Sequence, residues 1–116
     1  MKILITGATG FAGGYLLRYF SNIYGIENVH GTGRSLSKAS ILTDEGFTIK
    51  VGDLVDPEFV NSQLTSHDLI VHCAAKSSVW GSYDSFYKAN VVATKNLLEV
   101  INSEHQLIYF KRKHIF

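Results

Sequence analysis

Short apolar runs alternate along this chain with longer segments in which apolar residues recur at helical spacing. The apolar or alternating runs predict strands over residues 2–6, 28–33, 47–51, 68–75 and 107–110. The helical spacing predicts helices over residues 11–24, 35–45, 58–64 and 83–103. The strand at 28–33 is the weakest of these, because Val29 is its only strong strand former, and it depends on its neighbours in the pattern.

Residues that begin and end helices support this division of the chain. Gly25 and Gly46 follow the first two helices, Ser35 or Ser37 can cap the second, and Asp56 precedes Pro57 at the start of the third. Strands that alternate with helices predict an α/β fold with a parallel sheet and right-handed crossovers. We expect a doubly wound Rossmann sheet with strand order 3-2-1-4-5.

Size and composition fit one ordinary globular domain. The chain has 116 residues, 46% hydrophobic and 18% charged, with a formal net charge of +1. This balance gives no reason to expect nucleic acid or a membrane as partner, and the basic cluster at residues 111–114 is interpreted as a solvated tail. No apolar run is long enough for a signal peptide or a membrane span, so we expect a cytoplasmic protein.

The cysteine and the histidines suggest structural roles. Cys73 is the only cysteine, which excludes an internal disulfide, and its apolar flanks predict a buried packing residue. The histidines are scattered, without the spacing of a zinc site. His72 is therefore expected to be packed in the interior, and no metal is expected.

A glycine-rich loop between the first strand and the first helix carries the clearest chemical signal. Gly7 permits a tight turn, Gly10 lets the backbone approach a phosphate, and Gly13 lets the helix pack close to the strand. The N–H groups of residues 10 to 13 and the positive end of the helix form an anion site. The loop therefore predicts that the chain binds the pyrophosphate of a dinucleotide.

The glycine spacing also carries a family resemblance. The stretch Thr6-Gly7-Ala8-Thr9-Gly10-Phe11-Ala12-Gly13 resembles the Thr-Gly-x-x-Gly-x-x-Gly loop of extended short-chain dehydrogenases/reductases, the NAD(P)-dependent epimerase/dehydratase superfamily. Gly52-Asp53-Leu54 resembles that family's segment after the third strand, which implies that the Asp contacts the adenine amino group and the next residue lines its pocket. His72-Cys73-Ala74-Ala75 resembles the motif on the fourth strand, where the backbone passes the ribose.

Two further stretches extend the resemblance. The stretch Asn90-Val91-Val92-Ala93-Thr94-Lys95-Asn96-Leu97-Leu98 resembles the family's Asn-Val-x-Gly-Thr-x-Asn-Leu-Leu helix, with alanine in place of its glycine. Residues 74–81 and 86–90 are most similar to the 3β-hydroxysteroid dehydrogenase-like branch. The resemblance runs to about residue 109 and implies an NAD(P)-binding domain over residues 1–110, followed by a basic tail outside the family pattern at residues 111–116.

The end of the second predicted strand bears on the choice of dinucleotide. Sites that prefer NAD place a carboxylate there, but this chain has Arg34, 21 positions after Gly13. Arg34 can bind a 2′-phosphate through its planar fork, with a hydrogen bond from Ser35 and added charge from Lys38. We therefore expect NADP in preference to NAD. The alternative is that Arg34 stacks on the adenine and both cofactors are used.

These expectations define a candidate cofactor site. It comprises the loop, the basic residues after the second strand, and the family positions after the third and fourth strands and on the last helix: Gly7, Ala8, Thr9, Gly10, Phe11, Ala12, Gly13, Arg34, Ser35, Lys38, Asp53, Leu54, Cys73, Ala74, Ala75, Lys76 and Asn90.

The resemblance also implies an acid–base pair, Tyr-x-x-x-Lys, that lies beyond the fifth strand in family members. Tyr109 and Lys113 have this spacing, but a strand separates such residues by about 13 Å where a helix separates them by about 6 Å. We therefore assign no catalytic residue and expect a sheet truncated after the fifth strand, with an edge open to self-association.

Three functions remain open at this point. The chain is the cofactor-binding part of an oxidoreductase or epimerase acting on a hydroxyl or carbonyl group of a sugar nucleotide, a steroid or a similar substrate. Alternatively, it is a non-catalytic module that senses dinucleotides, or an inactive truncated product.

Overall fold

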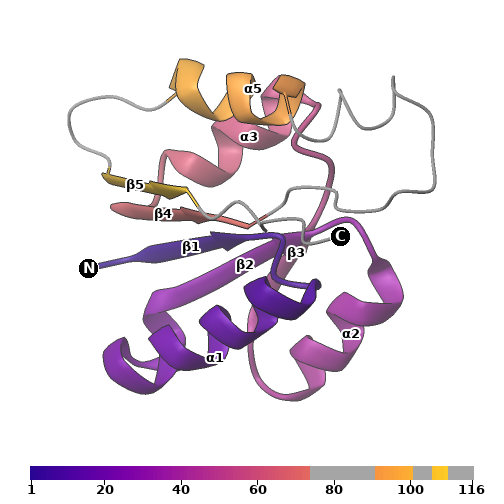
Figure 1. Cartoon of the computed structure of the whole chain (residues 1–116). Coiled ribbons are helices and arrows are strands. Elements are labelled where there is room, and N and C mark those ends of the chain that lie inside the picture. Colours follow the sequence, from indigo (N-terminus) through magenta and orange to yellow (C-terminus); the bar gives the residue numbers. More distant parts are fainter. Residues whose placement is uncertain (74–90, 101–105, 110–116) are drawn as a thin grey trace, which may run out of the picture.

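The computed structural model describes residues 1–73, 91–100 and 106–109, which form a parallel sheet with helices on both faces (Figure 1). The strands and helices alternate in the predicted order. Their bounds are β1 (Ile3–Thr6), α1 (Phe11–Tyr24), β2 (Val29–Gly33), α2 (Leu36–Asp44), β3 (Thr48–Val51), α3 (Pro57–Leu64), β4 (Leu69–His72), α5 (Ala93–Val100) and β5 (Gln106–Tyr109), with a 3₁₀ turn at Ile26–Asn28.

The sheet has the strand order β3-β2-β1-β4-β5, and every neighbouring pair is parallel. This confirms the order predicted from the alternation of strands and helices. The central strand β1 pairs Ile5 with Gly31 of β2 on one side and with Val71 of β4 on the other. The strand order reverses between β1 and β4, and in such sheets ligands bind beyond the carboxyl ends of the strands at this reversal.

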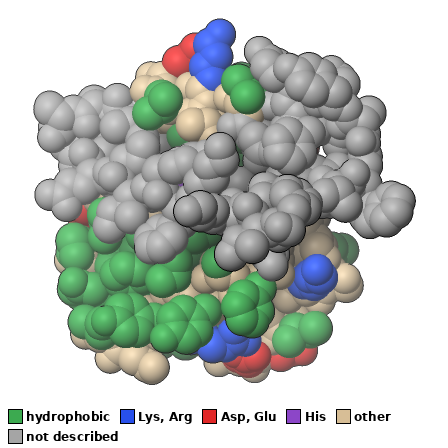
Figure 2. Space-filling view, viewed as in Figure 1, with side chains coloured by type: hydrophobic (Ala, Val, Ile, Leu, Met, Phe, Trp, Pro, Cys, Tyr) green, Lys and Arg blue, Asp and Glu red, His purple; other side chains and the backbone are tan. Residues whose placement is uncertain are grey.

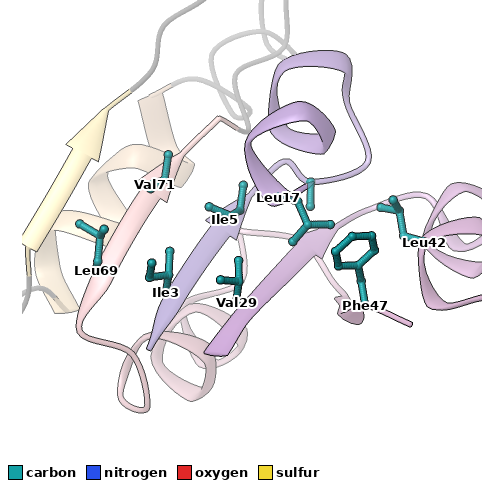
Figure 3. Close-up of a cluster of buried hydrophobic side chains, with 9 residues drawn as sticks. Ile3, Ile5, Leu17, Val29, Leu42, Phe47, Leu69 and Val71 are labelled. Carbon is teal, nitrogen blue, oxygen red and sulfur yellow. The ribbon is translucent and has the colours of Figure 1, made fainter. Parts of the chain in front are cut away.

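Alternate residues of the strands pack into two hydrophobic clusters, one on each face of the sheet. The first lies between the sheet and the helices α1 and α2 (Figure 3) and consists of Ile3, Ile5, Ala8, Leu17, Val29, Leu42, Phe47, Leu69 and Val71. The second lies on the face covered by α3 and α5 and consists of Leu4, Leu54, Val60, Ile70, Ala93 and Leu97. Strands buried on both faces explain why the apolar runs are continuous.

The helix boundaries follow the capping signals in the sequence. Ser35 Oγ accepts a hydrogen bond from the Lys38 N–H at 3.2 Å, and Asp56 Oδ1 accepts one from the Glu58 N–H at 3.1 Å. The α1 helix ends at Gly25, whose φ is 92°. Of the two capping serines considered, the structure therefore selects Ser35.

Some predicted boundaries differ from those observed. Phe47 was expected to begin the third strand, but β3 starts at Thr48, and the Phe47 ring is buried in the first cluster. Asn28 was expected in the second strand and instead ends the 3₁₀ turn. The predicted helix over 83–103 is described only over residues 91–100, and its remaining residues lie outside the described part of the chain.

The outer side of α1 carries aromatic side chains. Tyr15 and Tyr19 are exposed and stack with their ring centroids 6.4 Å apart, and Tyr19 contacts the half-buried Phe20 edge to face. Apolar side chains accordingly gather on the surface in the region of α1 (Figure 2). Aromatic pairs four residues apart stabilise a helix.

Among the described helices, none has both the length and the apolar character needed to cross a membrane.

Candidate functional site

A cavity of about 270 Å³ opens at the carboxyl ends of β1, β2, β3 and β4. It lies where the strand order reverses, and the amino ends of α1 and α2 follow the same ends of the strands (Figure 1). Its walls are formed by Gly7, Thr9, Gly10, Thr32, Gly33, Arg34, Ser35, Lys38, Gly52, Asp53, Leu54, Cys73 and Ala93. The structure thus brings together residues from four loops that are distant in the sequence.

The glycine loop forms one wall. Gly7 has a φ of 68°, a left-handed conformation suited to glycine, and its carbonyl accepts the Gly10 N–H at 3.0 Å. Gly13 packs so closely on the strand end that a Cβ there would lie 2.0 Å from the Gly7 oxygen. Gly10 differs, because it is exposed and a Cβ there would come no closer than 3.4 Å to another atom, the Gly7 oxygen. The tight turn at Gly7 and the close packing at Gly13 agree with the prediction.

The amino end of α1 is suited to an anion. Its N-cap residue is Gly10, which has no side chain to bond the first N–H groups, and its first turn contains no acidic residue. Unbonded N–H groups at a helix start carry partial positive charge and bind phosphate readily. This wall can therefore hold a pyrophosphate through backbone groups alone.

The end of β2 packs tightly against the glycine loop. The Ala8 N–H donates to the Thr32 oxygen at 2.9 Å, and a Cβ at Gly33 would lie 2.5 Å from the Thr9 side chain. Thr32 and Gly33 both line the cavity, yet neither was expected there from the sequence. The sequence signal for Gly33 is only that a glycine ends the predicted strand, and its lack of a side chain leaves room for the Thr9 side chain.

A basic edge follows β2. Arg34 and Lys38 are exposed and line the cavity, and neither side chain has an ion pair or hydrogen bond within the described part of the chain. Ser35 begins α2, and its hydroxyl lies 3.2 Å from that of Ser37. Positive charge without a carboxylate partner suits a second phosphate group.

The loop after β3 forms the wall next to the basic edge, because β3 pairs with β2. Asp53 is exposed, and its Oδ1 accepts the Val55 N–H at 3.0 Å, while Leu54 is buried in the second cluster. Gly52 also lines the cavity; its N–H donates to the Gly33 oxygen at 3.0 Å, and a Cβ there would lie 2.3 Å from the Phe59 ring. This wall therefore offers an apolar surface beside a hydrogen-bonding carboxylate, as an adenine ring requires.

The end of β4 supplies a buried polar chain. Thr6 Oγ1 lies 2.6 Å from His72 Nδ1 and accepts the Cys73 N–H at 3.1 Å, while His72 Nε2 lies 3.3 Å from Thr94 Oγ1. Burial lowers the pKa of His72 to about 4, so its ring is neutral at pH 7. Burial also raises the pKa of the Cys73 thiol to about 11, so this thiol is protonated at pH 7 and a poor nucleophile.

The remaining candidate residues occupy other places. Ala8 and Gly13 are buried behind the cavity wall, whereas Phe11 and Ala12 are exposed in the first turn of α1 and do not line the cavity. Ala74, Ala75, Lys76 and Asn90 lie outside the described residues. Ala93, which the sequence did not mark as a site residue, completes the cavity from α5.

Two histidines that are far apart in the sequence meet near the opposite end of the sheet. His30 Nδ1 lies 2.8 Å from His67 Nε2, and His67 Nδ1 donates to the Gln63 oxygen at 2.6 Å. Within the described ranges, no three His, Cys, Asp or Glu residues are grouped to hold a metal ion. The pair connects β2 with the segment before β4.

Known proteins resemble this chain over nearly its whole length. The NAD dependent epimerase/dehydratase family matches residues 3–111. The chain is 37% identical over 99 residues to the 2-alkyl-3-oxoalkanoate reductase of Stenotrophomonas maltophilia (strain K279a), which covers 84% of this chain and 28% of that protein. It is 30% identical over 103 residues to the decarboxylating sterol-4-alpha-carboxylate 3-dehydrogenase of Dictyostelium discoideum, with 87% and 30% covered.

Solved structures show the same likeness in three dimensions. L-threonine dehydrogenase from Clostridium difficile superposes with a TM-score of 0.80 at 27% identity, over 93% of this chain and 35% of that one. The chain therefore spans roughly a third of the length of these relatives. Because the matched region contains the glycine loop, the whole cavity wall and all the described strands, the chain belongs to the NAD-dependent epimerase/dehydratase family.

Proposed function

We propose that the cavity binds NADP in preference to NAD, and that the chain is the cofactor-binding part of an enzyme acting on a hydroxyl or carbonyl group. The observation that carries the proposal is the basic edge at Arg34 and Lys38, where no carboxylate lines the end of β2. An acidic residue at this position would bond the 2′-hydroxyl of NAD and repel a 2′-phosphate. The family supports an NAD(P) dinucleotide in general.

Each wall has a part in this proposal. The first turn of α1 holds the pyrophosphate, and the exposed backbone at Gly10 gives it access. Arg34 pairs with the 2′-phosphate, aided by Ser35 and Lys38. Asp53 accepts a hydrogen bond from the adenine amino group, and the adenine ring packs beside Leu54. When bound, the cofactor supplies the hydride chemistry. The neutral His72 keeps the ends of β1 and β4 together without adding charge to the site.

The substrate proposal is broader. The names of the relatives, an oxoalkanoate reductase and a sterol dehydrogenase, support a substrate whose hydroxyl or carbonyl lies on an apolar skeleton, as in the 3β-hydroxysteroid dehydrogenase-like branch. Because no acid–base residue is assigned to the chain, we expect it to bind cofactor without turning over substrate by itself. β5 is the outermost strand on its side of the described sheet, and we propose that this strand can pair with a second copy.

Calorimetric titration with NADPH and NADH tests the proposed function. We expect both to bind, with NADPH binding more tightly because Arg34 adds a charge-assisted hydrogen bond to the 2′-phosphate. Replacing Arg34 with alanine should weaken the binding of NADPH by about tenfold or more and change the binding of NADH far less.

Arg18→Ala is the matched control, since Arg18 is also an exposed arginine but pairs with Glu45 at 3.0 Å and does not line the cavity. This variant should bind both cofactors as the wild type does. Equal losses of NADPH and NADH in Arg34→Ala would refute the 2′-phosphate role. A folded wild type that binds neither cofactor would refute dinucleotide binding itself.

A further inference from the structure

The wall formed by the loop after β3 is held from behind by one side chain of α5. Asn96 Nδ2 donates to the Leu54 oxygen and to the Val55 oxygen, each at 2.9 Å. The amide nitrogen carries two N–H donors, which is enough for one bond to each carbonyl. Asn96 is 8% exposed; its bond to the Leu54 oxygen is buried, and its bond to the Val55 oxygen is partly buried. The loop therefore has a fixed attachment on the side of α5.

The neighbours of Asn96 on α5 make further contacts with the same region. Ala93 lines the cavity, and Leu97 is buried in the same cluster as Leu54. Thr94 approaches His72 at the end of β4. These residues connect α5 to both the loop after β3 and the β4 end of the cavity, and Asn96 bonds directly to the loop.

We propose that Asn96 is a positioning residue for the adenine half of the dinucleotide, acting through the loop at residues 53–55. Asp53 and Leu54 line the cavity, whereas Asn96 does not. It holds the two carbonyls that follow Asp53, and so fixes where the Asp53 carboxylate and the Leu54 side chain face the adenine ring. This inference rests on the proposed dinucleotide binding and adds a residue that does not touch the cofactor.

We call the two hydrogen bonds from Asn96 to the Leu54 and Val55 oxygens the clamp, and its chemistry requires an amide. A carboxylate of the same shape would place negative charge against two carbonyl oxygens and offer no donor. An aliphatic side chain would leave both carbonyls without these bonds, and an unsatisfied buried polar group is costly. Asn96→Asp therefore removes the clamp with the smallest change in volume.

Titrations of Asn96→Asp with NADPH, ADP and inorganic pyrophosphate test the proposal. We expect NADPH and ADP, which contain adenine, to bind about tenfold more weakly than to wild type. Pyrophosphate contacts only the glycine loop in the proposed site, so its affinity should be unchanged. Lys95→Ala, which alters the exposed neighbouring side chain on α5, should leave all three affinities unchanged. An equal loss for pyrophosphate, or no loss for ADP, would overturn the proposal.

Amide hydrogen exchange provides a readout that does not depend on any ligand. The N–H groups of Val55 and Asp56 bond to the Asp53 side chain and the Asp53 oxygen, each at 3.0 Å. We expect both to exchange faster in Asn96→Asp than in wild type, while amides of β1 keep their rates. If Asn96→Asp does not fold, Asn96→Ser, which keeps one donor, should show the same selective effects at smaller size.

The two readouts separate the inference from the proposed function. If the wild type binds none of the three ligands, the proposed function fails, and the positioning role toward a cofactor fails with it. Faster exchange at Val55 and Asp56 would then show a loop clamp with no cofactor role. If the wild type binds ADP and the variant keeps both its affinity and its exchange rates, the proposed function stands and the role of Asn96 is refuted.

Discussion

Replacing Gly13 with alanine is expected to unfold the chain, whereas the same replacement at Gly10 should leave it folded. A Cβ at Gly13 would lie 2.0 Å from the Gly7 oxygen, 2.6 Å from the Gly7 carbonyl carbon and 3.0 Å from the Ala8 Cα. These are backbone atoms, which cannot rotate away as a flexible side chain can. We expect a loss of about 3 kcal/mol or more in the free energy of unfolding, a large share of the stability of a small domain.

Gly10 is the matched control in the same loop. A Cβ there would come no closer than 3.4 Å to the Gly7 oxygen, and its φ of −86° suits alanine. The free energy of unfolding should change by less than about 1 kcal/mol. The added methyl group would instead occupy the space that the pyrophosphate needs, so NADPH should bind at least about tenfold more weakly.

Urea denaturation followed by circular dichroism separates the two effects, with calorimetry on the variant that remains folded. A Gly13→Ala protein as stable as Gly10→Ala would show that the loop can move away from the helix, against the close packing described above. A Gly10→Ala protein that binds NADPH as tightly as the wild type would remove the glycine loop from the proposed site.

The order of the elements could be predicted from the sequence because each signal is local. Continuous apolar runs mark strands buried on both faces, and the caps at Ser35 and Asp56 act within one helical turn. Once helices alternate with strands, handedness and sheet geometry leave few topologies. The glycine loop was found for the same reason, since its three glycines follow one strand and open one helix.

Local sequence signals could not identify residues whose role is to let neighbouring segments pack closely, because such residues carry no reactive side chain. Gly33 and Gly52 line the cavity because β2 lies beside both β1 and β3, and the Gly52 N–H bonds to the Gly33 oxygen. That juxtaposition depends on the register of strands distant in the sequence. The resemblance placed Asn96 in a motif, but its bonds to the loop after β3 appear only when α5 is packed on the sheet.

The stability of the fold should fall as the pH drops from 6.5 to 4, because of His72. Burial lowers its pKa from 6.5 to about 4, so the unfolded chain takes up a proton in this range before the folded chain does. The stabilisation by neutral His72 is therefore fully present above pH 6.5 and is lost as the pH falls toward 4. The difference corresponds to about 3 kcal/mol at pH 4.

Denaturation with urea across this pH range measures the effect. The glutamine amide of His72→Gln does not titrate, so this variant should lose less stability than wild type on acidification. At pH 7 it should be less stable than wild type. The reduced stability at pH 7 follows from disturbing the hydrogen bonds with Thr6 and Thr94.

His67→Gln is the control that separates the effect of His72 from that of another histidine with a lowered pKa. Burial also lowers the pKa of His67, and nearby His30 and Lys2 act in the same direction, but the hydrogen bond to the Gln63 carbonyl and the charge of Asp68 oppose them. This variant should therefore keep most of the acid sensitivity of the wild type. If His72→Gln loses stability as steeply as wild type between pH 6.5 and 4, the acid sensitivity of the fold arises from other residues. Protonation of His72 would then leave its hydrogen bonds with Thr6 and Thr94 in place.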